Sequence, residues 1–182
     1  MKTIHLIRHC RSVGQEPEAR LTPAGVEQAR KLAAFLAGRG IDHVVSSPFA
    51  RAVSSITPFA EDEGLGLTLD ARLEERILSA EYHPDWQAML ERSFADHDLA
   101  FARGESARAA AKRGLAVFDE ILAGPDSNAA VVTHGNLMAL LLGNFDGGFG
   151  FEQWKALSNP DVYLLTFAAS GKPGIARVWN DA

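Results

Sequence analysis

The sequence predicts a single α/β domain over residues 1–182, a three-layer sandwich in which a mainly parallel sheet carries helices on both faces. Three observations support this fold class. Short apolar strands alternate along the chain with amphipathic helices. The 182 residues are enough for one sizeable core. A hydrophobic content of 47% and a charged content of 23% are ordinary for a globular protein, and no repeat or linker divides the chain.

The first strand and the first helix follow from local signals. Residues 2–7 are apolar and are followed by a charged loop, which is typical of a buried strand. Thr22-Pro23 is a helix start, with threonine as the N-cap and proline at the first helical position. Apolar residues recur at helical spacing over 26–36, and two glycines then end the helix.

The next segment repeats this alternation and then loses it. Residues 41–45 are predicted as a second strand, and Ser46-Ser47-Pro48 as the start of a helix that runs toward residue 63. Residues 65–69 are a third, weaker strand. Residues 72–103 show no clean period, so we expect them to form a small excursion over one end of the sheet. The aromatic and histidine side chains of this excursion could contact a ligand or form the core of a helical cap.

The second half is expected to contain a helix, a buried strand, an apolar helix and an antiparallel edge hairpin. Asn159-Pro160 is expected to be a simple turn before that hairpin. The five elements are predicted at residues 104–122, 129–133, 137–142, 162–167 and 175–179.

Composition excludes several classes of protein. A net charge of −5 gives no reason to expect nucleic-acid binding. One cysteine excludes an internal disulfide framework and a cysteine-rich zinc site. The longest apolar run, 137–142, has six residues, whereas a membrane span needs about 20. With no targeting segment in the sequence, we expect a cytoplasmic protein that has no membrane partner.

Polar residues follow three of the predicted strands. The first strand ends in Arg8 and His9, the second is followed by Arg51 in the next helix, and the fourth ends in His134 and Gly135. Ligands bind at the carboxyl ends of strands in open α/β sheets. If these strands are neighbours, two histidines and two arginines converge there. Such a cluster suits a dianionic phosphoryl group, because the planar guanidinium bonds two phosphoryl oxygens at once.

The same residues carry a resemblance to a known family. The ordered motifs resemble the histidine phosphatase superfamily, in its phosphoglycerate-mutase-like branch, over residues 4 to about 167. Each motif is weak alone, but all of them in this order are specific. They are Leu6-Ile7-Arg8-His9 with Ser12 and Gln15, Leu21-Thr22 with Gly25, Gln28 and Ala29, Ser46-Ser47-Pro48 with Arg51-Ala52, Leu73 with Glu75, Gly104-Glu105-Ser106, and Val132-Thr133-His134-Gly135.

The resemblance implies roles for five residues. His9 matches the nucleophile that forms a phosphohistidine, and its second ring nitrogen is expected to donate to a backbone carbonyl. Arg8, Arg51 and a protonated His134 match the phosphate pocket. Glu75 matches the general acid that protonates the leaving alkoxide and then activates water. Protein cations supply the electrostatic stabilisation, so the family chemistry implies no metal and no cofactor.

Four further residues are candidate substrate contacts. Ser12 and Gln15 match the loop that contacts the transferred group, and Gly135 and Arg11 lie beside the same pocket. Glu74 stands next to Glu75 and is the alternative general acid, although the family spacing favours Glu75.

The chain departs from the family directly after the nucleophile. The family usually has glycine there, followed by an acid or an amide, whereas this chain has Cys10 and Arg11. If the family's glycine adopts a positive φ angle, Cys10 is strained at that position. If the glycine is needed because the backbone lies close to the pocket, the Cys10 side chain narrows the pocket. A thiol in a cationic pocket is also expected to have a lowered pKa and to oxidise readily. Cys10 is not predicted as the nucleophile, because Glu16 stands where a cysteine phosphatase needs arginine.

The sequence therefore predicts a phosphomonoester hydrolase that acts on a small phosphorylated metabolite, as a monomer or a homodimer. Three alternatives remain: a phosphoglycerate-mutase-type transferase, a protein-phosphohistidine phosphatase, and a phospho-ligand-binding protein that has lost turnover. A metal hydrolase built from His5, His9 and His134 is a weaker possibility.

Overall fold

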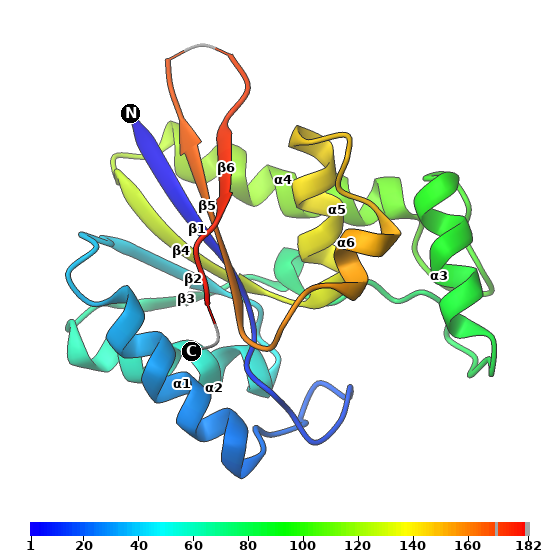
Figure 1. Ribbon diagram of the computed structural model, residues 1–182, viewed down its shortest axis with the longest axis horizontal. Helices are drawn as coiled ribbons and strands as arrows, with labels where there is room; N and C mark the ends of the chain where they lie inside the picture. The colour runs from blue at the N-terminus through cyan, green and yellow to red at the C-terminus, as the bar shows by residue number, and fades with distance from the viewer. Residues whose placement is uncertain (170, 181–182) are drawn as a thin grey trace.

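The computed structural model describes residues 1–169 and 171–180, and in them the chain forms one α/β sandwich around a mixed sheet (Figure 1). The described residues contain six strands in the order β3-β2-β4-β1-β5-β6. The four strands from β3 to β1 are parallel, and β5 and β6 add an antiparallel edge. The strands are β1 Lys2–Arg8, β2 His43–Ser46, β3 Leu67–Leu69, β4 Asn128–Thr133, β5 Asp161–Phe167 and β6 Gly174–Arg177.

Helices cover both faces of the sheet, as the sequence predicts. In Figure 1, α1 and α2 lie on one side, α4, α5 and α6 lie on the other, and α3 stands apart at the edge of the molecule. The helices are α1 Pro23–Leu36, α2 Ala50–Asp62, α3 Trp86–Ala95, α4 Ala107–Ala123, α5 Gly135–Phe145 and α6 Phe151–Lys155, with a short 3₁₀ turn, η1, at Ala71–Leu73.

The sheet separates two hydrophobic cores. Ile4 and Leu6 of β1 pack with α4 and α5, whereas Ile7 packs with α1 and α2. Successive side chains of a strand point to opposite faces, so one buried strand serves both layers. The apolar segment 137–142 lies in α5 and is buried throughout, because α5 packs between the sheet and α4.

The helix-start signals were accurate for α1 and displaced for α2 and α4. Thr22 caps α1, with its hydroxyl accepting from the Gly25 amide at 3.0 Å. Helix α2 begins at Ala50, after Phe49 and without a side-chain cap, because the preceding serines bond elsewhere. Helix α4 begins after Ser106, which caps it, rather than at residue 104.

Part of the predicted buried face of α1 is turned to solvent. Val26 is 42% exposed, and Gly25 takes the inner position instead. A Cβ atom at Gly25 would lie 2.0 Å from the Arg11 carbonyl oxygen, so only glycine lets α1 approach the loop after β1 this closely.

The segment at 72–103 forms η1, a loop and α3. Helix α3 reaches the main body through ring contacts to α6, with Trp86 and Trp154 centroids 6.1 Å apart and Phe94 and Phe151 centroids 6.2 Å apart. The sequence did not predict α6, which is five residues long. Together α3 and α6 form the wall of a cavity described below.

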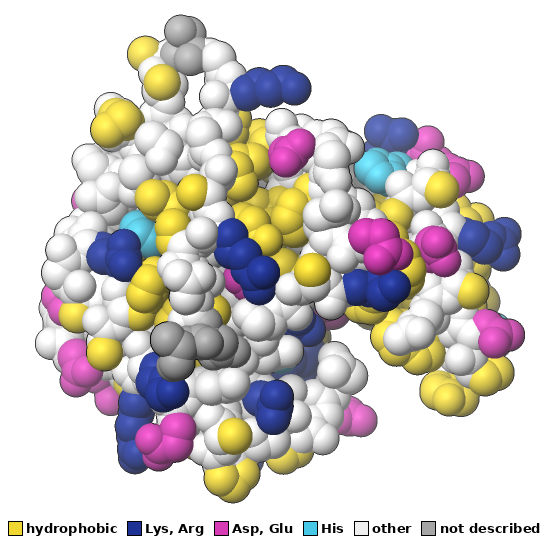
Figure 2. Space-filling model, in the orientation of Figure 1, with side chains coloured by type: hydrophobic (Ala, Val, Ile, Leu, Met, Phe, Trp, Pro, Cys, Tyr) yellow, Lys and Arg dark blue, Asp and Glu magenta, His cyan; other side chains and the backbone are white. Residues whose placement is uncertain are grey.

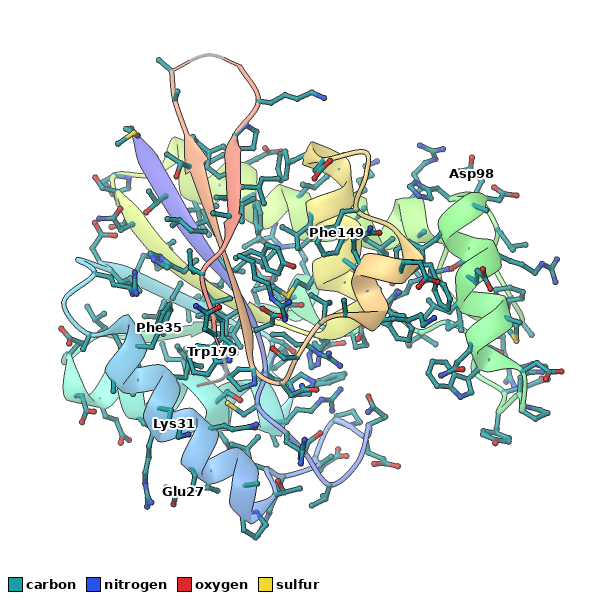
Figure 3. The ribbon with its side chains drawn as sticks, in the orientation of Figure 1. Glu27, Lys31, Phe35, Asp98, Phe149 and Trp179 are labelled. Atoms are coloured by element: carbon teal, nitrogen blue, oxygen red, sulfur yellow. The ribbon has the colours of Figure 1, made fainter. Side chains whose placement is uncertain are left out.

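The C-terminal hairpin is confirmed, with β6 shorter than expected. Strand β6 ends at Arg177, and Trp179 then packs edge-on against Phe35 of α1, with centroids 5.2 Å apart (Figure 3). In the described part of the chain, no helix is long and apolar enough to cross a membrane.

Candidate active site

The carboxyl ends of β1, β2 and β4 meet at one edge of the sheet and carry the predicted polar residues. Strand β4 lies between β1 and β2, so the chain segments that follow these three strands are neighbours. The His9 amide donates to the Thr133 carbonyl at 3.1 Å, and the Ser47 amide donates to the Val132 carbonyl at 2.9 Å. These backbone bonds extend the parallel ladder past the strand ends and fix the positions of the side chains beyond them.

His9 is a nearly buried, neutral imidazole. Its Nδ1 lies 2.7 Å from the Cys10 carbonyl oxygen, so Nδ1 carries the proton and Nε2 keeps its lone pair. Burial lowers the pKa of His9 to about 3; the Cys10 carbonyl opposes this, and the nearby Arg51 and Arg8 add to it. The Nε2 atom accepts a hydrogen bond from Arg51 Nε at 3.2 Å.

Arg51 is fully buried, Arg8 is partly buried, and backbone carbonyls hold both guanidinium groups. Arg51 Nη1 donates to the carbonyls of Gln15 and Glu16 at 3.0 and 2.8 Å. Arg8 Nη1 donates to the carbonyls of Leu157 and Ser158 at 3.0 and 3.3 Å. Burial lowers the pKa of both guanidinium groups from its usual high value.

His134 lies beside His9, with ring centroids 5.1 Å apart in an edge-to-face arrangement. Its Nε2 is 2.8 Å from the Ser47 hydroxyl. Burial holds the pKa of His134 well below its usual value, and the charge of Arg51 lowers it further. Burial therefore favours a neutral His134 in a pocket without a phosphoryl group, and its protonation beside a bound dianion stays a prediction.

Glu75 binds the N-terminus of α5. Its two carboxylate oxygens accept from the amides of Asn136 at 3.0 Å, Leu137 at 2.9 Å and Arg76 at 2.9 Å. The first amides of a helix have no partner within the helix, so a carboxylate is favourable there. The backbone carbonyl of Glu74, the sequence alternative, accepts from Arg113 of α4 at 2.9 Å, and Glu74 does not line the site cavity in the described chain.

An open cavity of about 340 Å³, the site cavity, is bordered by Arg8 and Glu75, whereas His9, Arg51 and His134 are not among its lining residues in the described chain. An outer cleft of about 710 Å³ shares Gln15, Leu78 and Trp86 with it, and Figure 2 shows the hollow between the main body and the part of the chain around α3. The site cavity is lined by Arg8, Gln15, Glu75, Arg76, Leu78, Trp86, Leu90, Gly135, Asn136 and Trp154.

Comparison with known proteins identifies the family. The sequence model of the histidine phosphatase superfamily, branch 1, matches residues 4–182. The chain belongs to the histidine phosphatase superfamily. The family and the enzyme class predicted from the sequence, a phosphatase, are thereby confirmed.

Solved structures of other histidine phosphatases share the fold. Mycobacterial glucosyl-3-phosphoglycerate phosphatase is 26% identical, with 99% of each chain covered and a TM-score of 0.78. Phosphoserine phosphatase from Entamoeba histolytica is 19% identical, with 97% of this chain and 96% of that chain covered and a TM-score of 0.79. Bacillus stearothermophilus YhfR is 20% identical at the same coverage and TM-score. A search of curated protein sequences found no match.

The four candidate substrate contacts of this histidine phosphatase fall into two pairs: Gln15 with Gly135, and Ser12 with Arg11. Gln15 and Gly135 line the site cavity, and a Cβ atom at Gly135 would lie 3.0 Å from the Arg8 guanidinium. Ser12 instead donates its hydroxyl to the Gly14 carbonyl at 2.9 Å. Arg11 is exposed, and neither Ser12 nor Arg11 lines the site cavity within the described chain.

Cys10 does not lie in the phosphatase pocket. Its side chain is fully buried in the core between the sheet, α1 and α2, and its amide donates to the Ser55 hydroxyl at 2.8 Å. In the described residues Arg103 is the single non-glycine residue with a positive φ angle, so Cys10 is not strained. The expectation of a readily oxidised thiol in a cationic pocket is wrong, because the residue turns its side chain to the opposite side.

Sequence reasoning missed three residues of the site. Asn159, read as part of a simple turn, donates its side-chain amide to the His9 carbonyl at 2.7 Å. Arg76 and Asn136 line the site cavity. Both directly follow predicted site residues, Glu75 and Gly135, and this adjacency was the available signal. The described residues contain no cluster of three or more histidine, cysteine, aspartate or glutamate side chains placed to hold a metal ion.

Proposed function

We propose that this histidine phosphatase hydrolyses a small phosphorylated metabolite through a phosphohistidine at His9. The observation that carries the proposal is the state of His9: a neutral ring, held by Nδ1 on a carbonyl, with its Nε2 lone pair next to the Arg51 guanidinium. An unprotonated nitrogen beside fixed cations is what attack on a phosphoryl dianion requires. The phosphatase relatives support the same class of substrate.

Substrate binding must first release the nucleophile. Arg51 Nε donates to His9 Nε2 in the unliganded protein, so this bond has to break before Nε2 can attack. A phosphoryl oxygen is a better acceptor for a guanidinium than a neutral imidazole, because the resulting hydrogen bond joins two charged groups. Arg51 thus turns from the nucleophile to the substrate, and Arg8 is the second cation on the phosphoryl oxygens.

The reaction then proceeds in two steps. His9 Nε2 forms a bond to phosphorus as the ester P–O bond breaks, and protonated Glu75 gives its proton to the leaving alkoxide. Glu75 next takes a proton from water while that water attacks the phosphohistidine, which releases inorganic phosphate and restores His9. The arginines carry the electrostatic stabilisation, so the proposed steps need no metal.

Turnover of p-nitrophenyl phosphate tests this proposal. The wild-type protein should release p-nitrophenol and phosphate, and His9→Ala should lose at least about 10³-fold in kcat. His43→Ala is the matched control, since His43 begins β2 at the opposite end of the strand and should keep activity. Labelled phosphate should be trapped on wild-type protein by an alkaline quench and should be absent from His9→Ala.

The same assay separates the rival functions. With 3-phosphoglycerate, a phosphatase releases inorganic phosphate, whereas a mutase returns an isomer and no free phosphate. Binding of phosphorylated ligands without turnover of any of them would instead identify a phospho-ligand-binding protein and would contradict the proposal.

A further inference from the structure

The start of α1 carries a sequence motif that takes no part in the proposed reaction. Its members are Leu21-Thr22, Gly25, Gln28 and Ala29. Thr22, Gly25 and Gln28 follow one another at intervals of three residues, which places them on one side of the start of the helix. This side faces the backbone of Arg11, two residues after His9.

The backbone of Arg11 is bound to α1 at both of its polar groups. The Gln28 side-chain oxygen accepts from the Arg11 amide at 2.9 Å. The Arg11 carbonyl accepts from the Thr22 amide at 3.0 Å and from the Thr22 hydroxyl at 3.4 Å. The close approach of Gly25 to that carbonyl leaves no room for a Cβ atom. Helix α1 therefore holds the loop after His9 by its backbone, while the Arg11 side chain is exposed.

The peptide bond between Cys10 and Arg11 connects Gln28 to His9. Its carbonyl accepts from His9 Nδ1 at 2.7 Å, and its amide donates to Gln28. A trans peptide is planar, and its N–H and C=O groups point in opposite directions. A bond that fixes the direction of the amide thus also fixes the direction of the carbonyl that holds the imidazole.

The preceding peptide, between His9 and Cys10, is held at both ends as well. The His9 carbonyl accepts from the Asn159 side chain at 2.7 Å, and the Cys10 amide donates to the Ser55 hydroxyl at 2.8 Å. Side chains from α1, from α2 and from the segment before β5 therefore bind two successive peptides. Bonds at both ends of a peptide restrict its rotation, so this part of the loop is rigid.

The bond at His9 Nδ1 matters most when substrate is bound. In the unliganded protein Arg51 Nε donates to His9 Nε2 and so favours an unprotonated Nε2. In the proposed complex Arg51 turns to the phosphoryl group, and the dianion next to Nε2 favours a proton there. A neutral imidazole carries one proton, so the Cys10 carbonyl keeps Nε2 unprotonated by holding that proton on Nδ1.

We infer that Gln28 is a positioning residue for the nucleophile. It fixes the peptide between Cys10 and Arg11, so that the carbonyl keeps the proton of His9 on Nδ1 and leaves Nε2 free to attack. The inference rests on the proposed function, because it takes His9 as the nucleophile. Gln28 does not line the site cavity within the described chain, so it acts through this peptide rather than on the substrate.

A matched set of Gln28 variants tests this role in the reaction. Gln28→Met keeps the length of the side chain and removes the acceptor, so kcat for p-nitrophenyl phosphate should fall by about 10-fold while KM changes by less than about 3-fold. Gln28→Glu keeps an oxygen for the Arg11 amide and should restore kcat to within about 3-fold of wild type. Lys31→Met, on the exposed side of the same helix (Figure 3), should retain wild-type kcat.

Proton NMR measures the bond at His9 without turnover. The Nδ1 proton, assigned by its loss in His9→Gln, should exchange with water at least about 10-fold faster in Gln28→Met than in wild type. In Gln28→Glu it should exchange as slowly as in wild type. Backbone amides of β1 and β4 report the opening of the whole fold, so a general loss of stability would accelerate them by the same factor as the ring proton. We expect them to accelerate less.

Gln28→Ala provides a second variant should methionine disturb the loop. It removes the acceptor without adding an apolar group next to Arg11, and it should reproduce the lower kcat and the faster ring-proton exchange. The positioning role is overturned if both variants keep wild-type kcat, or if KM rises at constant kcat. It is also overturned if the ring proton and the strand amides accelerate equally, or if Gln28→Glu behaves like Gln28→Met.

The two readouts separate this inference from the proposed function. A ring proton whose exchange depends on Gln28, in a wild-type protein that turns over nothing, would support the positioning of His9 and overturn only the hydrolytic reaction. A phosphohistidine at His9 in wild type, together with unchanged kcat and ring-proton exchange in Gln28→Met, would overturn only the role of Gln28.

Discussion

At the scale of single residues, the site depends on histidines that burial keeps neutral. His9 Nε2 is available because Nδ1 is committed to the Cys10 carbonyl and because the ring is almost completely removed from water. Burial and neighbouring cations act in the same direction here, since each disfavours an imidazolium. The same features that suit His9 to the proposed role of nucleophile therefore make it difficult to protonate.

This neutrality predicts how the stability of the protein depends on pH. The pKa of His9 is about 3 when folded, against an unfolded value of about 6.5, so the unfolded chain takes up the proton first as pH falls. The contribution of His9 to the free energy of unfolding is constant above that unfolded value. It should decrease by about 2 kcal/mol between about pH 8 and about pH 5. His134 acts in the same direction.

Urea unfolding of wild-type and His9→Gln protein at these two pH values measures the effect. Glutamine does not titrate, so the variant should lose less stability on acidification than the wild type. Equal losses in the two proteins would contradict a neutral, buried His9.

Cys10 illustrates a limit of sequence reasoning at this scale. Its neighbours in the sequence are charged or catalytic, so a position in the pocket was the natural expectation. Consecutive residues after a strand can face opposite sides, and Cys10 turns toward Ser55 and the core under α1 and α2. Direction of a side chain in a loop depends on tertiary packing, which a motif does not encode.

At the scale of elements, regular periodicity was predictable and mutual packing of short segments was not. The strands and the amphipathic helices bury one face or both, so their spacing is visible in the sequence. Helices α3 and α6 pack on each other through Trp86 and Trp154, and neither has a period long enough to detect. For α2, the start signal failed because the Ser47 hydroxyl contacts His134 instead of capping the helix.

The segment between α6 and β5 forms hydrogen bonds with Arg8 and His9 at the end of β1. Leu157 and Ser158 supply carbonyls to Arg8, and Asn159 donates to the carbonyl of His9. Asp161, which is fully buried, binds the Ser158 amide and forms an ion pair with Arg177. One segment thus positions both Arg8 and His9 through backbone groups.

Removing one of these bonds should affect the chemical step more than binding. Asn159→Ala frees the His9 carbonyl, which loosens the nucleophile, so kcat should fall by about 10-fold while KM changes by less than about 3-fold. Steady-state kinetics with p-nitrophenyl phosphate measures both. Asn144→Ala, at an exposed position of α5, is the control and should retain wild-type kcat. A rise in KM at constant kcat would assign Asn159 to substrate binding instead.

At the scale of the whole molecule, a protein of net charge −5 places two buried arginines, Arg51 and Arg76, and the partly buried Arg8 at one end of its sheet. Arg8 and Arg51 were predictable, because a motif places each of them after a strand. Arg76 was not, since its position depends on Ser93 and Glu105, which the fold brings to it from 17 and 29 residues away. The convergence of distant segments is what a single sequence leaves undetermined.

Burying positive charge for phosphate binding should lower the stability of the folded protein. Arg51 is fully buried, and among the described residues its hydrogen bonds go to two carbonyls and His9 rather than to a carboxylate. Burying a charge without an oppositely charged partner in hydrogen-bond contact is costly, and an apolar side chain of similar length removes that cost. Arg51→Met should therefore have a melting temperature at least equal to that of the wild type in phosphate-free buffer, while losing phosphatase activity.

Inorganic phosphate should make the wild-type protein more stable than Arg51→Met. A ligand present at 100 times its dissociation constant stabilises the folded state by about 2.7 kcal/mol, so phosphate should raise the Tm of wild-type protein. The rise should be absent in Arg51→Met and retained in Arg30→Met, which removes an exposed arginine from α1. Thermal unfolding across a phosphate titration measures all three proteins. If Arg51→Met gains as much Tm from phosphate as the wild type does, Arg51 does not bind the phosphoryl group. If Arg51→Met melts far below the wild type without phosphate, the buried guanidinium stabilises the fold, and the expected cost of burying it is contradicted.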